Sequence, residues 1–509
     1  MTSVRLKTLS LAGWAMLVWG LPFSHAAMSV GTAWVGVLAL WNLCTTPQSR
    51  HNLTSSPHWR PLLWLVALLG WSTLSMLWTN DAMWGWRMLG LQWPIVVLMA
   101  AWPALGMVEH DRMKVQGWVL GSACVAMLTC LLWGGWNLVQ GEALDGRDWS
   151  PWVSHVRLSL FAALGLGWAA PSRALWQLAL FSLVWAVFVG VTGSLTSALL
   201  LPMSWAWIGL QRFPDTWQPW YRGGVLALTA VGALAAAWTL QPTPLPAQPW
   251  PTSSSWGNPY VHRPDRLASE NGHRLHMHVC RAEWEQAWDQ ISDVPLSTLS
   301  QAGFPLSARL WRYLTSKGWP KDGSHILQLA PAEVERIESG ATSVVERRGF
   351  QARMAAFRWE WETWLEGGNP SGHSVFQRLE HWGAGWCAWS QAWWIGNGAG
   401  DAEAALQSGY EATGTQLASQ HRHRAHMQHL TWGVTGGLVA VVLWMAFLGS
   451  QVWGIRAVKG AVWGGLVVAL SCMFEDTLET QAGVVVAGLA WTLVSAVQTN
   501  KPSAASEAS

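Results

Sequence analysis

The chain has 509 residues, of which 51% are hydrophobic, 12% are charged and 44 are tryptophan. These proportions are typical of a polytopic membrane protein, so a lipid bilayer is the first partner that we expect. The formal net charge is only +2. A nucleic-acid-binding protein needs a broad positive field, and we therefore expect no nucleic-acid partner.

Apolar runs predict transmembrane helices at both ends of the chain, because a membrane crossing needs roughly 20 mostly apolar residues. On this measure we expect twelve spans, centred on residues 8 to 24, 28 to 45, 61 to 78, 86 to 105, 116 to 138, 154 to 171, 173 to 190, 193 to 211, 222 to 240, 429 to 449, 457 to 474 and 481 to 498. The first span resembles a signal peptide with a small-residue site near Ala26 and Ala27. The apolar run from Gly31 to Leu43 follows directly, which favours a retained helix.

Basic residues outside the long polar segment predict the orientation of these spans. If the N-terminus is cytoplasmic, the same side collects Arg5, Lys7, Arg50, Arg60, Arg112, Lys114, Arg173, Arg212, Arg222, Arg456, Lys459 and Lys501. The opposite side collects Arg87, Arg147 and Arg157. This bias predicts cytoplasmic termini and a polar segment that faces away from the cytoplasm.

The polar segment, residues 241 to 428, carries 16 of the 31 Lys and Arg and 18 of the 29 Asp and Glu. We expect it to be a soluble insert. Residues 1 to 240 would then hold spans one to nine, residues 429 to 500 the last three, and residues 501 to 509 a cytoplasmic tail.

Helical patterns fill most of this insert. They cover residues 281 to 291, 307 to 323 and 342 to 366, and another begins at Pro331, with no competing strand alternation. The sequence therefore predicts an all-α protein. The insert holds two cysteines, Cys280 and Cys387, which an oxidising compartment would permit to form a disulfide.

Two arginines are candidates for binding an anion. Arg378 lies in the helical pattern SVFQRLEHWGAGW, where a surface arginine paired with Glu380 or another acid is the alternative interpretation. Arg157 lies near the outer end of an apolar run. An arginine costs about 2.5 to 3.5 kcal/mol at mid-membrane, so a partner or a function is expected, although its side chain could also snorkel to the surface.

His426 directly precedes the apolar helix LTWGVTGG, where an imidazole could act as general base beside a lipid-anchored substrate. It belongs to a run that also contains His421, His423 and His429, and a second run, HRLHMHVC, covers residues 273 to 280. Neither run has the His-Glu-x-x-His or paired-cysteine spacing of a metal site. We expect solvated faces there and no metal.

An acidic cluster, Glu475, Asp476 and Glu479, lies between two predicted spans on the outer side. Three roles are open for it: a second base, a contact to an acceptor sugar, or partners that hold the arginines in place. The third role is the one that we favour.

These stretches together resemble the O-antigen ligase and polymerase superfamily of bacterial envelopes, and most closely its ligase-like members from Bacteroidetes. The resemblance is carried by SHVRLSL at 154 to 160, NPYVHR at 258 to 263, RYLTSKGWPKD at 312 to 322, the helix and IESG ending at Gly340, SVFQRLEHW at 374 to 382, GNGAGD at 396 to 401, RAHMQHLTWGVTGG at 424 to 437 and FEDTLETQAG at 474 to 483.

The resemblance implies an all-helical fold related to GT-C glycosyltransferases, located in the bacterial inner membrane with its active site facing the periplasm. The family's insert arginine matches Arg378 and its histidine matches His426. Many members carry Ser-Arg where this chain has Ser194 and Leu195, so Arg157 is the substitute that we expect. Members often have His-Asn where this chain has Met427 after the histidine.

The resemblance also implies a reaction that needs no cofactor. The donor would be a glycan carried on undecaprenyl diphosphate, and the arginines would stabilise the leaving diphosphate without a metal. His426 would deprotonate an acceptor hydroxyl, giving inversion at the anomeric carbon. Arg424 and the three acidic residues are further candidates for contacting the acceptor or supporting the site.

The acceptor would be lipid A core for a ligase. It would be another repeat unit for an O-antigen or exopolysaccharide polymerase, and a protein for an O-oligosaccharyltransferase of the same superfamily. A secondary transporter is a more remote alternative, because it predicts paired halves and mid-span charges that this sequence does not show.

Overall fold

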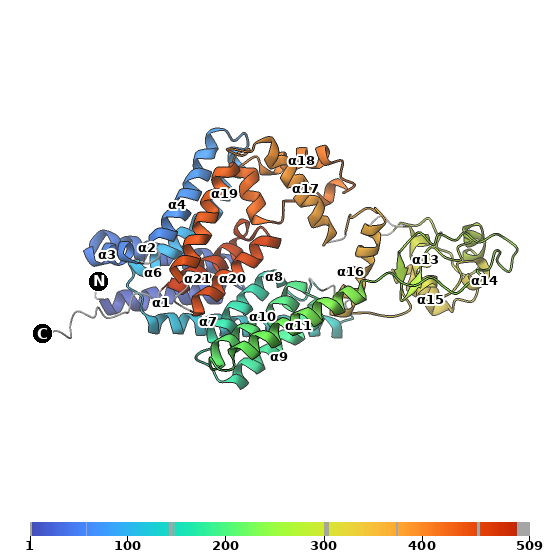
Figure 1. Ribbon diagram of the computed structural model, residues 1–509, viewed down its shortest axis with the longest axis horizontal. Coiled ribbons are helices and arrows are strands. Elements are labelled where there is room, and N and C mark those ends of the chain that lie inside the picture. The colour runs from blue at the N-terminus through green and yellow to red at the C-terminus, as the bar shows by residue number, and fades with distance from the viewer. Residues whose placement is uncertain are drawn as a thin grey trace. The chain divides into compact units, whose positions relative to one another are not determined.

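The computed structural model describes residues 3–56, 59–141, 146, 148–299, 305–372, 375–455 and 459–495. The chain divides into unit 1, Met1–Leu226 with Arg378–Ser509, and unit 2, Ala227–Gln377 (Figure 1). The predicted insert is therefore shared: its residues up to Gln377 belong to unit 2, and the rest belongs to unit 1. The predicted tail, Arg147 and Arg456 lie outside the described residues.

Unit 1 consists of helices throughout its described residues. Its α-helices are α1 (Ser3–Gly20), α2 (His25–Thr45), α3 (Pro47–Ser55), α4 (Trp59–Leu74), α5 (Ala82–Gln92), α6 (Pro94–Ala104), α7 (Glu109–Val139), α8 (His155–Ala169), α9 (Leu175–Thr192), α10 (Leu195–Arg212), the first part of α11 (Gln218–Thr239), α17 (Phe376–Gln391), α18 (Ala402–Thr413), α19 (Gln428–Ile455), α20 (Lys459–Phe474) and α21 (Gln481–Ser495). Three short 3-10 helices are η1 (Ser75–Leu77), η3 (Ser419–His421) and η4 (Thr477–Glu479).

Two helices form the centre of unit 1. Every residue of α8 from Arg157 to Ala169 is buried, and so is every residue of α21 from Val484 to Leu493. Both are apolar on all sides, and such a helix is stable only inside a larger packed body. α8 packs on α7, α10 and α20, while α21 packs on α6 and α20. The N-terminal ends of these two buried helices frame the site described below.

All twelve predicted spans fall on helices, but only six of the described helices are long and apolar enough to cross a membrane by length and composition. These are α2, α4 with η1, α7, α9, α11 and α19. Large apolar side chains point outward on several of them, including Leu40 and Trp41 on α2, Leu183 on α9 and Trp238 on α11. Such exposed apolar surface suits a lipid environment.

The other six predicted spans fall on helices that are too short or too polar to cross a membrane by length and composition. These two properties therefore do not support the prediction of twelve spans. α8 and α21 have only 15 residues each, and α20 has 16. The predicted span at 86 to 105 is divided into α5 and α6 of 11 residues each, because Pro94 has no N–H to continue the helical ladder. α1 and α10 include charged residues such as Arg5 and Arg212.

α19 is not one straight helix, although its sequence reads as a single span. Trp444 Nε1 donates a hydrogen bond of 2.7 Å to His429 Nδ1. Fifteen residues of straight helix would separate these two by about 22 Å. The chain therefore folds back at Gly437, whose φ of 63° and ψ of −160° are non-helical. Residues 428 to 436 form a short arm against the long arm that begins at residue 438.

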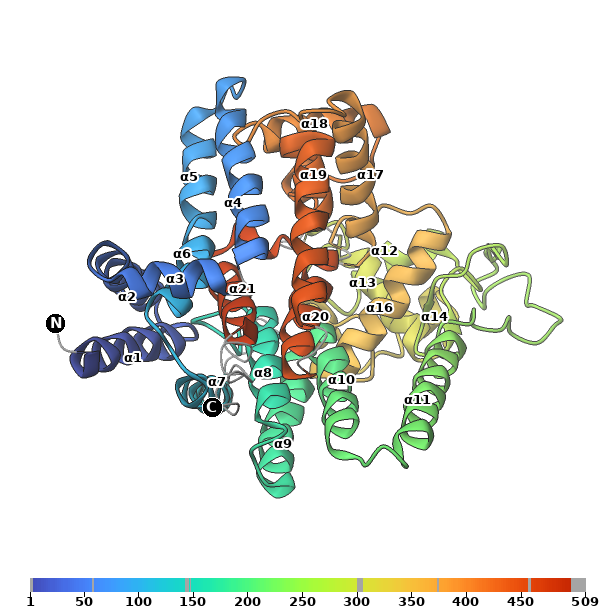
Figure 2. The same ribbon diagram turned by 60° about the vertical axis from the view of Figure 1, so that its left-hand side comes forward.

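The break at Gly437 is covered by the turn between α17 and α18, which lies beside one end of α19 in both views (Figures 1 and 2). Asn397 N and Gly398 N donate to the carbonyls of Val434 and Thr435, which end the short arm. Leu438 N, which begins the long arm, donates to Trp393 O. These bonds satisfy backbone groups that a broken apolar helix would otherwise leave unpaired.

Fewer than half of the described residues of unit 2 are helical, because non-helical segments such as residues 240 to 268 separate its helices, so the unit is less helical than we predicted. It also has one small hairpin. It contains η2 (Arg281–Glu283), α12 (Trp284–Trp288), α13 (Leu306–Ser316), α14 (Gly323–Ile326), α15 (Pro331–Glu338), α16 (Gly349–Leu365) and the strands β1 (Ser269–Glu270) and β2 (His273–Arg274). The antiparallel strands are joined by Asn271 and Gly272, both with positive φ, which is the requirement of a type I′ turn. The sequence analysis missed this hairpin, although Asn-Gly is its strongest local signal.

Buried aromatic and aliphatic side chains of α12 to α15 form the core of unit 2. The largest of these side chains belong to Trp284, Trp288 and Tyr313. Cys280 is a free thiol in this unit, and Cys387 is a free thiol in unit 1, so the disulfide alternative is not realised.

Gly437→Ala tests the fold-back of α19. A Cβ at this position would lie 2.4 Å from the backbone of Trp394, and a non-glycine residue with this φ costs about 1–3 kcal/mol in addition. We expect a clearly lower apparent Tm in detergent. The matched control is Gly449→Ala in the same helix, where nothing lies within 4 Å of the added Cβ and no loss is expected. Equal melting of both variants would contradict the fold-back.

Candidate functional site

Three predicted site residues from distant parts of the sequence, Arg157, Arg378 and His426, lie around the carboxylate of a fourth, Glu475. Arg378 Nη2 lies 2.7 Å from Glu475 Oε1. The other oxygen, Oε2, lies 3.9 Å from Arg157 Nη2 and 3.9 Å from His426 Nδ1. Arg378 is thus paired with Glu475 across the fold, whereas the Glu380 carboxylate accepts a hydrogen bond from Thr415 Oγ1.

Each cation is held by its own element. Arg157 lies in the first turn of α8, is 8% exposed, and donates from Nε to Thr480 Oγ1 at 3.2 Å. Arg378 lies near the start of α17, and its Nε donates to the carbonyl of Phe474 at 3.2 Å. Both guanidinium groups are therefore bound by the chain that connects α20 to α21, which also carries Glu475.

This connecting chain is fixed from several sides. Asp476 accepts bonds from His426 N and from Thr431 Oγ1. Leu478 N donates to Oε1 of the fully buried Gln428, and Ser471 and Thr477 share a hydroxyl bond of 2.6 Å. Consequently Asp476, which the sequence analysis grouped with candidate bases, is used to hold the backbone of the His426 segment.

His426 adopts a left-handed backbone conformation with a φ of 49°. This conformation is uncommon for residues other than glycine and costs of order 1–3 kcal/mol. The bond from its N–H to Asp476 Oδ2, at 2.9 Å, stabilises it. The result is that the imidazole turns toward Glu475 just before the short arm of α19 begins.

The charges around Glu475 determine its protonation. Burial alone would raise the pKa of this carboxyl, but the nearby His426 and the charges of Arg157 and Arg378 outweigh burial and lower the pKa to about 2. Glu475 is therefore ionised at every physiological pH.

His381 and Tyr410 belong to the same site, and the sequence analysis missed them. His381 is buried one turn after Arg378, and its ring centroid lies 5.1 Å from that of His426. Its Nδ1 is 2.5 Å from Tyr410 Oη, which donates to the carbonyl of His423. Burial, together with the nearby His426, lowers the pKa of His381 to about 3, so this imidazole is neutral. A signal was present, because His381 and Arg378 share one face of a helix at i, i+3.

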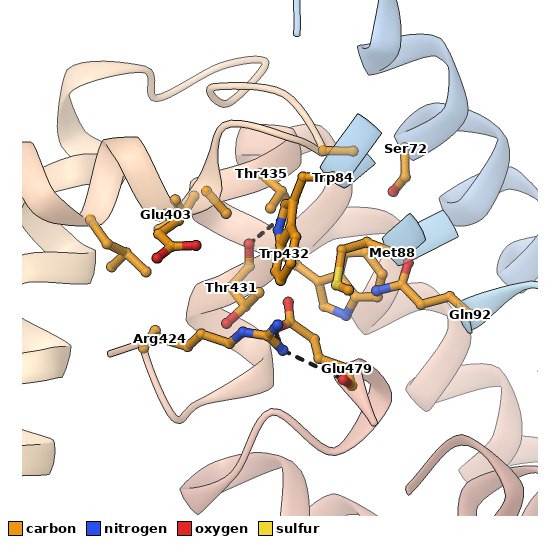
Figure 3. Close-up of a pocket in the computed structure, with 15 residues that line it drawn as sticks. Ser72, Trp84, Met88, Gln92, Glu403, Arg424, Thr431, Trp432, Thr435 and Glu479 are labelled. Carbon is orange, nitrogen blue, oxygen red and sulfur yellow. Dashed lines mark hydrogen bonds and ion pairs between the residues drawn. The ribbon is translucent and has the colours of Figure 1, made fainter. Parts of the chain in front are cut away.

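Arg424 and Glu479 form a second ion pair beside the first. Arg424 Nη1 lies 2.6 Å from Glu479 Oε2, and its guanidinium is 5.3 Å from the centre of the Trp84 ring. Burial and the neighbouring Asp476 raise the pKa of Glu479, although Arg424 opposes this shift. Figure 3 shows both side chains at a small cavity together with Trp84, Met88 and Trp432.

This cavity is too small for a sugar. Its volume is about 30 Å³, which is room for roughly two water molecules. The contacts of Arg424 and Glu479 therefore support the site from one side.

The histidine runs do not form a metal centre in the part of the chain that the structure describes. No group of three His, Cys, Asp or Glu residues there could hold a metal ion. His429 accepts a hydrogen bond from the indole N–H of Trp444, and His426 faces Glu475. In unit 2, His276 contacts Trp311 and His278 contacts His262 through their rings.

Together, these features describe a mainly helical protein with helices of membrane-spanning length and a cluster of arginine, histidine and glutamate at the ends of its two central helices. No model of a known protein family matches the chain, and no curated protein is significantly similar to it.

The ionisation of Glu475 predicts how stability depends on pH. The pKa of Glu475 is about 2 in the folded protein and about 4.3 in the unfolded chain. The ionised carboxylate therefore contributes to the free energy of unfolding in full above about pH 4.3, and this contribution is lost as the pH falls toward 2. We expect wild type to melt at a higher temperature than Glu475→Gln above about pH 5, with a smaller difference near pH 3. The measurement is tryptophan fluorescence during heating in detergent.

Glu411→Gln, an exposed change at the end of α18, is the matched control and should follow wild type at both values of pH. If the difference in melting temperature between wild type and Glu475→Gln increased toward low pH, the prediction would be contradicted.

Proposed function

We propose that this protein is a membrane glycosyltransferase of the O-antigen ligase type, which transfers a glycan from undecaprenyl diphosphate to an acceptor hydroxyl. The observation that carries this proposal is the convergence of Arg157, Arg378 and His426 on one carboxylate. Two arginines suit a diphosphate, because their donors bind phosphate oxygens and stabilise the charge that develops when the glycosidic bond breaks. An adjacent imidazole supplies a base for the acceptor.

The surroundings of the arginines favour an anion as well. The N-terminal ends of α8 and α21 lie at the site, where the helix dipoles attract negative charge. Arg157 is buried here, and a buried arginine needs a counter-ion. Helices of membrane-spanning length next to this site would hold the polyprenyl tail of the donor.

In the reaction that we propose, His426 accepts the proton of the acceptor hydroxyl while that oxygen attacks the anomeric carbon. The bond to the diphosphate breaks, and the arginines receive the leaving group, so the anomeric configuration inverts. Glu475 near Nδ1 favours the tautomer with its proton on that nitrogen, which leaves Nε2 as the acceptor. Neither a cofactor nor a metal ion takes part in this scheme.

The finer topology belongs to the proposal. We propose a GT-C-like arrangement of twelve membrane helices in the bacterial inner membrane, in which the shorter buried helices α8, α20 and α21 count as spans because longer ones enclose them. Both termini would be cytoplasmic, and the site would face the periplasm. Lipid A core is the acceptor that we propose, in line with the ligase-like resemblance of the sequence.

Replacing His426 tests the base. Alanine fits the left-handed backbone poorly, so His426→Asn is the better variant, because asparagine tolerates this conformation and is not a base. We expect transfer of glycan from undecaprenyl diphosphate to lipid A core to fall about 100-fold to 10,000-fold, with donor binding retained.

The control is His421→Ala in η3, which should transfer at a rate close to that of wild type. Full activity of His426→Asn would move the base elsewhere. Activity lost with EDTA and restored by zinc would replace the scheme with a metal-dependent one, and elongation of the lipid-linked glycan would identify a polymerase.

Replacing Arg378 tests the contact to diphosphate. Its guanidinium donates to Phe474 O and to Glu475 at the same time, and a lysine has only one nitrogen for these roles. We therefore expect Arg378→Lys to transfer nearly as poorly as Arg378→Ala. Arg422→Lys, a change at an arginine that binds the carbonyl of Leu417, is the control. Wild-type activity in Arg378→Lys would indicate a simple surface charge.

A further inference from the structure

Glu475 lies where the proposed ligand would place its negative charge. Its Oε1 is closely bound by Arg378, at 2.7 Å. Its Oε2 is held only loosely, 3.9 Å from both Arg157 and His426, which is beyond normal hydrogen-bond distance. One carboxylate with two oxygens thus faces three potential donors and satisfies one of them closely.

A diphosphate fits the same donors better than a carboxylate does. It carries more negative charge and more oxygens, so both guanidinium groups can bind it at hydrogen-bond distance. The carboxylate has a different use when no ligand is bound. Arg157 is 8% exposed, and its charge would lack a counter-ion close by if Glu475 were neutral.

We propose that Glu475 is an internal counter-ion that occupies the anion site of the ligand-free protein, and that a lipid-linked diphosphate displaces it from the two arginines. The inference rests on the proposed function, because that function names the diphosphate. Displacement also links binding to catalysis. Once the arginines hold the diphosphate, His426 is the hydrogen-bond donor that remains near Glu475, and the carboxylate then orients the imidazole that acts as base.

The charges nearby restrict this exchange to Glu475. The chain between α20 and α21 carries three carboxylates, and three arginines lie around it: Arg157, Arg378 and Arg424. Asp476 is bound by a backbone N–H and a hydroxyl, and Glu479 is bound by Arg424. Neither of these carboxylates contacts the two arginines that we assign to the diphosphate.

The test measures binding of inorganic pyrophosphate to the full-length chain in detergent, by calorimetry. Glu475→Gln removes the competing charge and keeps the shape of the side chain. We expect pyrophosphate to bind it at least about fivefold and up to about 150-fold more tightly than wild type, the usual range of coupling between linked sites. Glycan transfer by the same variant should be slower, because His426 loses its carboxylate.

Glu479→Gln is the matched control, since it removes a carboxylate four positions away that pairs with Arg424. It should leave pyrophosphate affinity within about twofold of wild type, which is below the smallest shift of the coupling range. Equal tightening in both variants would mean a general effect of replacing a carboxyl in this part of the chain and would overturn the inference. If Glu475→Gln does not fold, Glu475→Asp is the second test, because the shorter side chain moves the carboxylate away from Arg378. Tighter binding of pyrophosphate by Glu475→Asp supports the displacement, and unchanged or weaker binding overturns it.

Arg378→Ala separates the failure of this inference from the failure of the proposed function. Weaker pyrophosphate binding in Arg378→Ala, combined with unchanged or weaker binding in Glu475→Gln, would overturn the displacement and leave the diphosphate site intact. Wild-type binding in both Arg378→Ala and Arg157→Ala would overturn both proposals.

Discussion

The structure of the site depends on one requirement, which is to neutralise Arg157 inside unit 1. A buried guanidinium without a counter-ion costs several kcal/mol, so a carboxylate has to be held close to it. The chain between α20 and α21 does this with Glu475, and the bonds of Gln428, Thr431 and Ser471 fix that chain in turn. Segments more than 300 residues apart in sequence are joined through this single side chain.

A second set of contacts brings α17, and with it Arg378, to the same place. The turn after α17 covers the break at Gly437, and Asp401 accepts bonds from the backbone N–H groups of Asn80 and Asp81 at the start of α5. Close approach leaves no space for a Cβ at the glycines of this turn: a Cβ at Gly400 would lie 1.9 Å from the carbonyl oxygen of Asp81. The GNGAGD stretch therefore anchors α17 to unit 1, which explains why the division between the units falls beside Arg378.

Hydropathy predicted the helices, and the charge in an apolar run singled out Arg157, because both are local signals. Arg378 and His426 were singled out by the resemblance of their motifs to those of a known family. Hydropathy could not find the fold-back of α19, since a hydropathy window reports composition and not chain direction. The adjacent glycines Gly436 and Gly437 were the available signal. The i, i+3 spacing of Arg378 and His381 was a local signal for His381. Tyr410 was missed for another reason: its role follows from a contact with His381 across 29 positions, which no local pattern encodes. Length and composition alone do not support α8 and α21 as spans, because each has only 15 residues and is buried within protein.

Glu475 and Glu479 show how the same residue type receives two different roles within one turn. Two arginines and an imidazole surround Glu475, so its charged form is favoured in spite of burial, and its pKa falls. Glu479 has one arginine and the nearby Asp476, so burial prevails and its pKa rises. Opposite pKa shifts in two neighbouring carboxyls give them different roles. One stays ionised as a permanent anion, and the other keeps its proton to higher pH. In this chain the permanent anion faces the two arginines and His426, and the group with the raised pKa faces the small cavity beside Trp84. Two arginines and an imidazole beside the less buried Glu475, and one arginine beside the more deeply buried Glu479, therefore decide which of the two can act as the counter-ion of the site.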